Sequence, residues 1–585
     1  MVKRGAGLAE LEPRSHSLVV RATGNRVGPF PREFKSLSRR QPLDCTATAS
    51  FPSFEFLTYQ AIYDHNLLVR EARGSTVDKP PMKDRRWMAA LLLVGVLLHV
   101  YAAVNSDLGL DAHVRLNALS DERSPEQDLP WGAPRISGDS SDAQGGIYSG
   151  FIPPWNTSEQ AMKATSVAAV FCLAVVVSIR PKWTTHAERF DPMFALLVLL
   201  SPVMVFSSSR GYDEAALSLT MSLGVLGYWF NRGDSPSACR LNGVLMATAV
   251  FMILGWKGFS LVASGAVWFV LIIASEIYVF ASHRYEGTPI GALVVHPWKM
   301  GLLSSAIVYV AVTMFGFVAS SGTFAIVGEH PGTFFIASLF ALFDALVLYL
   351  LVGCLLWSLL PGRWRGLYEA RGRGITMLTV YIAAVLSGVV AYIGTLWTLE
   401  SSLWGMKLTE VMVVLGNNGR YATVVIAPMM MLLRWVEPTP HASPKRPPQV
   451  IAVLVVTPFL IFTGAVGHQI WSEDAGEALS SQWSSEDDSF LLIASESMAM
   501  HHLYVIKSNI DLSGERNITG SWTTPGAAND WIESAGTSLD FLLVGPDVSF
   551  TVDETAWSLV ERRAVPVAVP GGIQAGSWSL YATHA

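Results

Sequence analysis

A series of long apolar stretches constrains this 585-residue chain most strongly. A helix needs about 20 mostly apolar residues to cross roughly 30 Å of hydrocarbon. Hydrophobic residues make up 51% of the chain and charged residues 15%, against roughly 25% charged in soluble domains. The sequence therefore predicts a multi-pass α-helical membrane protein with about eleven spans. The spans are expected at residues 87–104, 162–179, 192–207, 214–230, 241–256, 259–281, 300–319, 333–360, 375–397, 420–436 and 449–468.

Three regions follow one another along the chain. Residues 1–81 show no membrane or targeting pattern, and we expect them to be disordered or to be an over-extended gene start. The basic run MKDRRW at Met82 is typical of the residues before a first span, so residues 82–471 form the predicted membrane part. It includes a large first outer loop at 105–161. Residues 472–585 hold 4 basic and 16 acidic side chains, which predicts a separate domain in water.

The acidic C-terminal region is predicted to be a small α/β domain. Alternating or continuous apolar runs indicate strands, and apolar residues at helical spacing indicate helices. The strands are expected at 489–495, 501–510, 539–545, 564–570 and 577–584, and the helices near 526–534 and 554–562.

The distribution of Lys and Arg predicts the orientation. With the start of the first span inside, the inner segments hold 17 of these residues and the outer segments 8. Positive residues beside a span resist translocation. We therefore expect a cell-membrane protein with a cytoplasmic N-terminus and an extracytoplasmic C-terminal domain. The glycosylation sequons at Asn156 and Asn517 both fall on the predicted outer side.

The first polar cluster directly follows the first span and consists of Asp107, Asp111, His113 and Arg115. On a helix Asp111 and Arg115 are four residues apart and can form an exposed ion pair. Alternatively, Asp111 is placed to act as a general base on an acceptor hydroxyl, supported by the three other residues.

The second cluster, SSSRGYDEAALS at residues 207–218, contains Arg210, Asp213 and Glu214. One interpretation is a turn followed by favourable negative charge at a helix N-terminus. In the other, the adjacent carboxylates face those of the first loop. They then raise one another's pKa or hold a divalent cation such as Mg²⁺ or Mn²⁺, with Asp111 and Asp213 as ligands.

The third cluster is LGNNGRYATVVIAP at residues 415–428, where Arg420 and Tyr421 follow three turn-forming residues. Snorkelling explains an arginine at the membrane face. A bidentate contact with a lipid-linked phosphate explains it as well. Lys257 in GWKGF is a further outer-side cation, although a snorkelling lysine is the commoner arrangement.

The motifs GLDAHVR, SRGYDEAA and NNGRYA, set on this architecture, resemble the GT-C superfamily of integral-membrane glycosyltransferases. The resemblance implies that Asp111 is the base or acceptor-orienting carboxylate, that Asp213 and Glu214 help form the catalytic centre, and that Arg420 binds the donor phosphate. The WWDYG signature of oligosaccharyltransferases is absent from the sequence, and so is a second lumenal repeat module. A single-sugar transferase similar to the dolichyl-phosphate-mannose or lipid-A aminoarabinose type fits best.

This reaction needs a polyprenyl-phosphate-linked sugar donor and a protein, lipid or glycan acceptor, in contact with membrane lipids and without nucleic acid. The sugar phosphoester carries its own leaving group, so the enzyme must orient an acceptor hydroxyl and stabilise charge on the departing phosphate. The outer-side cations expected to bind that phosphate are Arg420, Arg210 and Lys257, with Tyr421 beside them.

Two other classes of function were weighed. Asp344 lies well inside an apolar span, where an ionisable residue indicates a functional site, so a proton-coupled transporter is the alternative. A hydrogen-bonded carboxyl between helices is the structural explanation of the same residue. A binding module anchored by the spans ranks last, because eleven spans exceed what anchoring needs. His501 and His502 are expected in one strand on opposite faces, which argues against a shared metal site.

Overall fold

The computed structural model describes the membrane part and the C-terminal domain with gaps. The predicted leader 1–81, the sequons at Asn156 and Asn517, and the site residues Asp111 and Arg115 lie outside the described residues. The described residues are 82–110, 112–113, 158–184, 189–257, 259–319, 323–359, 366, 368–404, 407–415, 418–435, 447–465, 470–484, 488–494, 499–510, 519–535, 539–546, 548–565 and 576–584.

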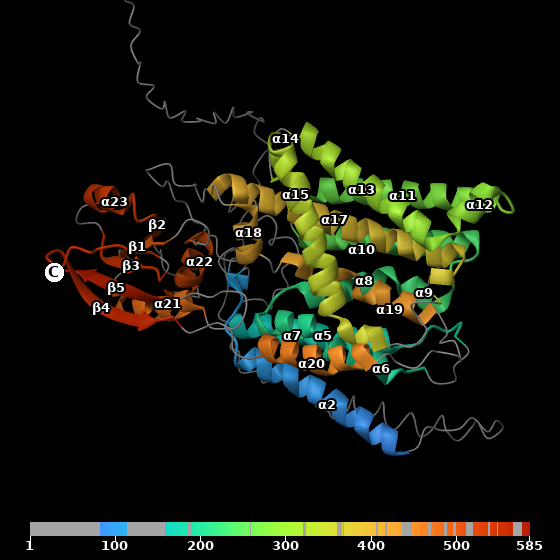
Figure 1. The fold of residues 1–585 in the computed structure, drawn as a ribbon, viewed down its shortest axis with the longest axis horizontal. Helices are drawn as coiled ribbons and strands as arrows, with labels where there is room; N and C mark the ends of the chain where they lie inside the picture. Colours follow the sequence, from blue (N-terminus) through green and yellow to red (C-terminus); the bar gives the residue numbers. More distant parts are fainter. Residues whose placement is uncertain are drawn as a thin grey trace, which may run out of the picture. The chain divides into compact units, whose positions relative to one another are not determined.

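The membrane part is a multi-pass bundle of helices (Figure 1). Within the described residues, seven helices are long and apolar enough to cross a membrane. The helices α6 (Pro192–Leu199) and α7 (Pro202–Ser209) are bent by 57° and form an eighth span if counted together. The seven are α2 (Met82–Val104), α5 (Glu159–Ser178), α10 (Pro236–Trp256), α11 (Leu261–Arg284), α13 (Pro297–Val318), α15 (Pro331–Leu342) continued by the π-helical η3 (Phe343–Val352), and α17 (Arg373–Trp404).

The predicted count of eleven spans is therefore not reached. The stretch 214–230 breaks into α8 (Glu214–Gly224) and α9 (Leu226–Phe230). The stretch 420–436 consists of the 3₁₀ helix η5 (Asn418–Val425) and α19 (Ile426–Trp435), and nearly all of both is buried. Apolar segments of this length suit the interior of a bundle as well as a membrane. The stretch 449–468 forms α20 (Pro447–Ala465), and among the residues described there the apolar helix Val453–Ala465 is shorter than a span.

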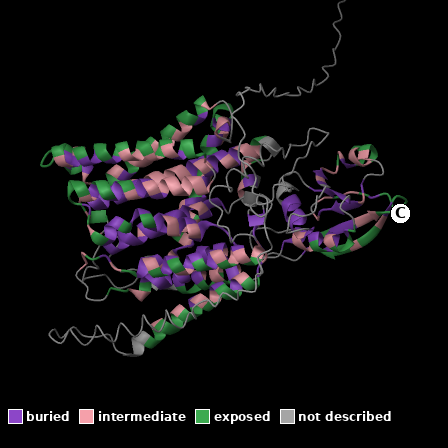
Figure 2. Ribbon diagram, turned by 180° about the vertical axis from the view of Figure 1, so that it is seen from behind, coloured by how far each residue is buried: buried purple, intermediate pink, exposed green. Residues whose placement is uncertain are grey.

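The central helix α17 packs against α13 and α15, and α10 packs against α8 and α11. Apolar side chains are exposed along α2, α11 and α13 (Figure 2), as expected for surfaces that contact lipid. The shorter helices join these elements: α12 (Pro289–Val294), η2 (Thr323–Ala325), α14 (Ile326–Glu329), η4 (Leu355–Leu359) and α18 (Leu408–Leu415).

The C-terminal domain is a five-stranded sheet with the order β2-β1-β3-β5-β4. The first three strands are parallel, and β5 runs antiparallel to β3 and β4. Helices α21 (Trp471–Gln482) and α22 (Ala499–Ile510) share a core with one face, and α23 (Ala528–Ala535) with the other. The strands are β1 (Ser489–Ile493), β2 (Thr519–Thr523), β3 (Phe541–Val544), β4 (Trp557–Ala564) and β5 (Ser577–Thr583).

Two predicted elements of this domain are wrong. Residues 501–510 form α22 and not a strand, because Leu503–Ile506 are all buried and leave no polar face to show the helical period. His501 and His502 consequently lie on a helix. The predicted helix 554–562 is mostly β4, where a bulge between Leu559 and Glu561 interrupts the strand alternation. The sequence also did not reveal α21 or β2.

Candidate functional site

The second and third polar clusters meet through an ion pair. Arg420, at the third residue of η5, places its Nε 2.7 Å from Oε1 of Glu214, at the first residue of α8. Each side chain is only 2% exposed. The Arg420 guanidinium is therefore held inside the protein, with the plane of its fork oriented by a carboxylate.

Aromatic rings and a second cation surround this pair. The Arg420 guanidinium carbon lies 4.2 Å from the centroid of Tyr212 and 5.0 Å from that of Tyr421. Lys257 Nζ lies 4.4 Å from the same Tyr421 centroid. Cations over aromatic faces are attracted by the ring quadrupole. The side chains of Lys257, at the end of α10, and Arg420, on η5, thus converge on one tyrosine.

The turn before α8 shapes the carboxylate side of the site. Ser207 Oγ donates a hydrogen bond of 2.7 Å to Oε2 of Glu214, the oxygen that Arg420 Nε does not contact. Gly211 adopts φ 65°, which favours glycine and lets the chain reverse within this short connection. Ser218 Oγ, one turn into α8, lies 2.6 Å from the carbonyl of Thr423 and ties α8 to η5.

The start of the first outer loop packs against the same turn. Gly109 N donates to the carbonyl of Arg210 at 2.9 Å. A Cβ at Gly109 would overlap the ring of Tyr212, so only glycine allows this approach. Gly109, two positions before Asp111, therefore contacts the SRGYDE turn, although Asp111 itself lies outside the described residues.

Arg210 is buried beside the ion pair but points differently. Its guanidinium carbon lies 4.1 Å from the centroid of the Phe206 ring. Its Nη1 donates hydrogen bonds to Ser209 Oγ at 2.9 Å and to the carbonyl of Gly464 at 3.4 Å. These contacts connect α7 with α20. Arg210 thus has structural partners of its own within the described residues.

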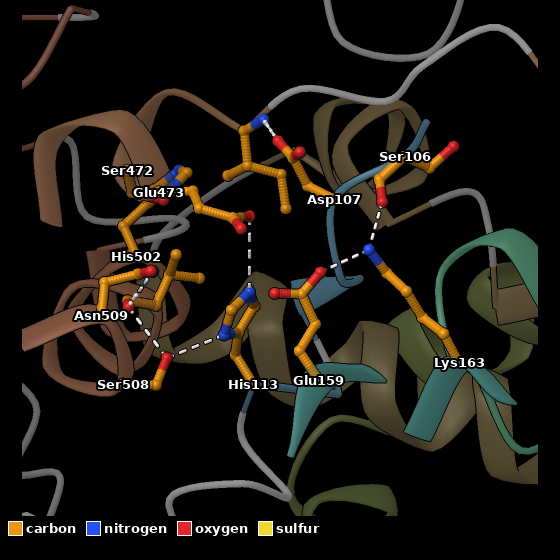
Figure 3. Close-up of polar contacts among 12 residues, drawn as sticks. Ser106, Asp107, His113, Glu159, Lys163, Ser472, Glu473, His502, Ser508 and Asn509 are labelled. Carbon is orange, nitrogen blue, oxygen red and sulfur yellow. Dashed lines mark hydrogen bonds and ion pairs between the residues drawn. The ribbon is translucent and has the colours of Figure 1, made fainter. Parts of the chain in front are cut away.

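Asp107 and His113, which the sequence predicts to support the catalytic centre, contact the C-terminal domain (Figure 3). Asp107 Oδ2 accepts a hydrogen bond of 2.7 Å from Ile470 N. His113 Nδ1 lies 2.8 Å from Ser508 Oγ on α22, and its Nε2 lies 3.8 Å from Glu473 Oε2 on α21. Lys163 bonds Glu159 and the Ser106 carbonyl close by. This cluster joins the membrane part to α21 and α22.

Burial is the largest cause of the pKa shifts in this cluster, which forms the joint between the membrane part and the C-terminal domain. It raises the pKa of Asp107 to about 7, and repulsion from Glu473 adds to the increase. It raises the pKa of Glu473 to about 8, with a contribution from Glu159, and lowers the pKa of His113 to about 4. Between about pH 4 and pH 7 the folded protein thus favours two protonated carboxyls and a neutral imidazole here.

The structure brings together Glu214, Arg420, Tyr421 and Lys257, with Arg210 and Asp213 in the same turn. Asp213 is the buried N-cap residue of α8. Sequence reasoning missed Ser207 and Tyr212, which stand inside the SSSRGYDE motif, and Glu473 and Ser508, for which the sequence offered no signal.

Within the described part of the chain, no group of three or more His, Cys, Asp and Glu side chains is arranged for a metal ion. No protein-family model, curated protein or solved structure matches this chain.

Proposed function

We propose that this protein is a membrane glycosyltransferase that moves a sugar from a polyprenyl-phosphate donor to an acceptor hydroxyl on the extracytoplasmic side. One observation carries the proposal. The buried pair Arg420–Glu214, with Lys257 across the Tyr421 ring, gathers two cations where η5 meets the start of α8 and the end of α10. An anionic phosphate on a membrane-bound lipid suits such a place.

In the proposed reaction the acceptor oxygen attacks the anomeric carbon of the sugar. The bond between that carbon and the phosphate oxygen breaks, and polyprenyl phosphate leaves with the bonding electrons. Arg420 and Lys257 stabilise the negative charge on the leaving phosphate. Asp111, assigned by the resemblance to GT-C enzymes, takes the proton of the acceptor hydroxyl. Asp213 belongs to the SRGYDE turn, which the start of the first outer loop contacts.

Glu214 has a supporting part in this proposal. A carboxylate next to a leaving phosphate would repel it, but this carboxylate is engaged by Arg420 Nε and Ser207 Oγ. Its effect is to orient the guanidinium and to offset the cost of burying it. Orientation before substrate arrives is the feature that makes electrostatic stabilisation effective in catalysis.

The topology that accompanies the proposal has the start of α2 inside and the sheet domain outside. Seven spans, like the predicted eleven, put the two ends on opposite sides, whereas eight would not. The orientation itself comes from the distribution of Lys and Arg over the eleven predicted spans.

The proposal is tested with the full chain in proteoliposomes supplied with radiolabelled polyprenyl-phosphate hexose or pentose and native membrane extract as acceptor. We expect the wild type to release polyprenyl phosphate and D111N to lose this activity at normal expression. The control D234N changes an exposed aspartate, 58% accessible, in another loop. Full turnover in D111N would remove Asp111 from the mechanism, and no turnover by the wild type with any donor would contradict the function.

A further inference from the structure

Asp344 contacts the segment that carries Arg420. It belongs to the π-helical η3 inside the Pro331–Val352 span, and only 1% of its surface is exposed. Its Oδ2 accepts a hydrogen bond of 2.7 Å from the backbone N of Gly419, the residue directly before Arg420. The buried carboxyl that suggested a transporter is thus bonded to the candidate site.

The π-helix explains how two side chains reach Gly419 together. The backbone hydrogen bonds of a π-helix join residues five apart, and Tyr349 follows Asp344 by five positions, about one turn later. A Cβ at Gly419 would lie 2.7 Å from Asp344 Cγ and 2.6 Å from Tyr349 Cδ2. Both side chains therefore press against the backbone at this glycine, which leaves no room for a larger residue.

The segment that follows needs such an anchor. Residues Asn418–Val425 form a 3₁₀ helix, whose hydrogen-bond geometry is poorer than that of an α-helix and which is uncommon at this length. The first N–H groups of a helix also lack partners within the helix. A buried carboxylate that accepts one of them fixes the beginning of the segment, and with it the direction in which Arg420 leaves the backbone.

We propose that Asp344 is a positioning residue that holds Gly419 and so aims the Arg420 guanidinium at Glu214. Its effect on sugar transfer rests on the proposed function, but its effect on the η5 backbone does not. The role requires an oxygen acceptor at this position and no titration. A proton-coupled carrier requires a carboxyl at this position that binds and releases a proton.

Asn and Ala at position 344 separate these two roles. D344N keeps a carbonyl oxygen for Gly419 N, so we expect KM for the polyprenyl-phosphate sugar within about twofold of wild type. D344A removes the acceptor, and we expect KM to rise about tenfold or more with a smaller change in kcat, as for loss of a buried hydrogen bond. Equal loss in D344N and D344A would overturn the positioning role in favour of a titrating carboxyl.

Amide hydrogen exchange of residues 419–425 tests the proposal without any donor. We expect faster exchange in D344A, wild-type exchange in D344N, and faster exchange in G419A, which keeps Asp344 but crowds it. The control D191A removes a carboxylate that accepts from Met193 N at the start of α6, and it should leave these amides unchanged. Wild-type exchange in D344A would overturn the positioning role. Altered exchange in D344A with no transferase activity in the wild type would overturn the proposed function and support the positioning role.

Discussion

Arg420 Nε and Glu214 Oε1 lie 2.7 Å apart, and both side chains are 2% exposed. A second Arg–Glu pair, Arg240 with Glu276, has nearly the same separation of 2.9 Å but is about half exposed. The two pairs share their chemistry and differ in burial. They therefore provide an internal comparison for what burial adds to an ion pair in this protein.

The first prediction uses that comparison. E214Q leaves the Arg420 charge buried without its carboxylate, so we expect a loss of about 3–5 kcal/mol in the free energy of unfolding. E276Q breaks the exposed pair, and we expect a loss of less than about 1 kcal/mol. Denaturant unfolding in detergent micelles measures both. Equal losses in the two variants would show that burial does not increase the contribution of the Arg420–Glu214 pair to the free energy of unfolding.

The second prediction concerns the contact between the first outer loop and the SRGYDE turn. G109A places a methyl group against the Tyr212 ring, so we expect destabilisation of about 1–3 kcal/mol and lower transferase activity. The control G265A adds the same methyl on α11, where no atom lies within 4 Å. Unfolding and turnover of the two variants are compared. Wild-type behaviour of G109A would mean that the loops do not pack in this way.

Sequence reasoning located the polar clusters because charged residues are rare in the apolar part and stand out at the ends of spans. It identified Arg420 and Glu214 separately but did not pair them, since they are 206 positions apart and nothing local relates them. It attributed Asp107 and His113 to the catalytic centre because they precede and follow Asp111. Their hydrogen bonds to Ile470 and Ser508 involve the other end of the chain and gave no local signal.

The third prediction is a pH dependence of the joint between the membrane part and the C-terminal domain. Asp107 and Glu473 have ordinary pKa values of 3.8 and 4.5 that folding raises to about 7 and about 8. The unfolded chain has released both protons well below pH 6.5, while the folded protein holds them until the pH passes about 7 and then about 8. Stability is therefore expected to fall as the pH rises from 6.5 to about 8, and to level off once both carboxyls are ionised in the folded protein as well.

The pKa of His113 works in the opposite direction and acts at lower pH. Folding lowers it from 6.5 to about 4, so its destabilising effect appears only as the pH falls below 6.5. We expect the double variant D107N with E473Q to flatten the decline in melting temperature between pH 6.5 and 8.5. The exposed control D553N should keep it. An unchanged slope in the double variant would contradict this account of the joint.

The fourth prediction concerns sidedness. The sheet domain is expected outside, so protease added to sealed right-side-out vesicles should remove a C-terminal epitope tag without permeabilisation. A tag that is cleaved only after the vesicles are opened would place the domain inside and favour eight spans. The same vesicles should protect a tag inserted at the exposed Gly287 turn between α11 and α12, which the orientation places inside.

The apolar pattern predicted a multi-pass helical fold, which the structure shows, but fewer of the described helices qualify as spans than the eleven predicted. Burial inside a bundle and burial in lipid select similar residues, so α8 and α19 could not be distinguished from membrane spans by composition. In the C-terminal domain the predicted strands at 489–495 and 539–545 are confirmed as β1 and β3, whose residues are all buried.

The most direct test of the central claim is the affinity of purified protein for polyprenyl phosphate, the common product of every donor considered. Binding to full-length protein in nanodiscs is compared for wild type, R420Q and R240Q. Loss of a charge-assisted bond to phosphate is worth about 1.5–3 kcal/mol, so we predict that R420Q binds roughly tenfold to hundredfold more weakly. R240Q is predicted to bind like the wild type. Equal affinity of folded R420Q and wild type, or no binding by the wild type, would contradict a lipid-phosphate site at Arg420.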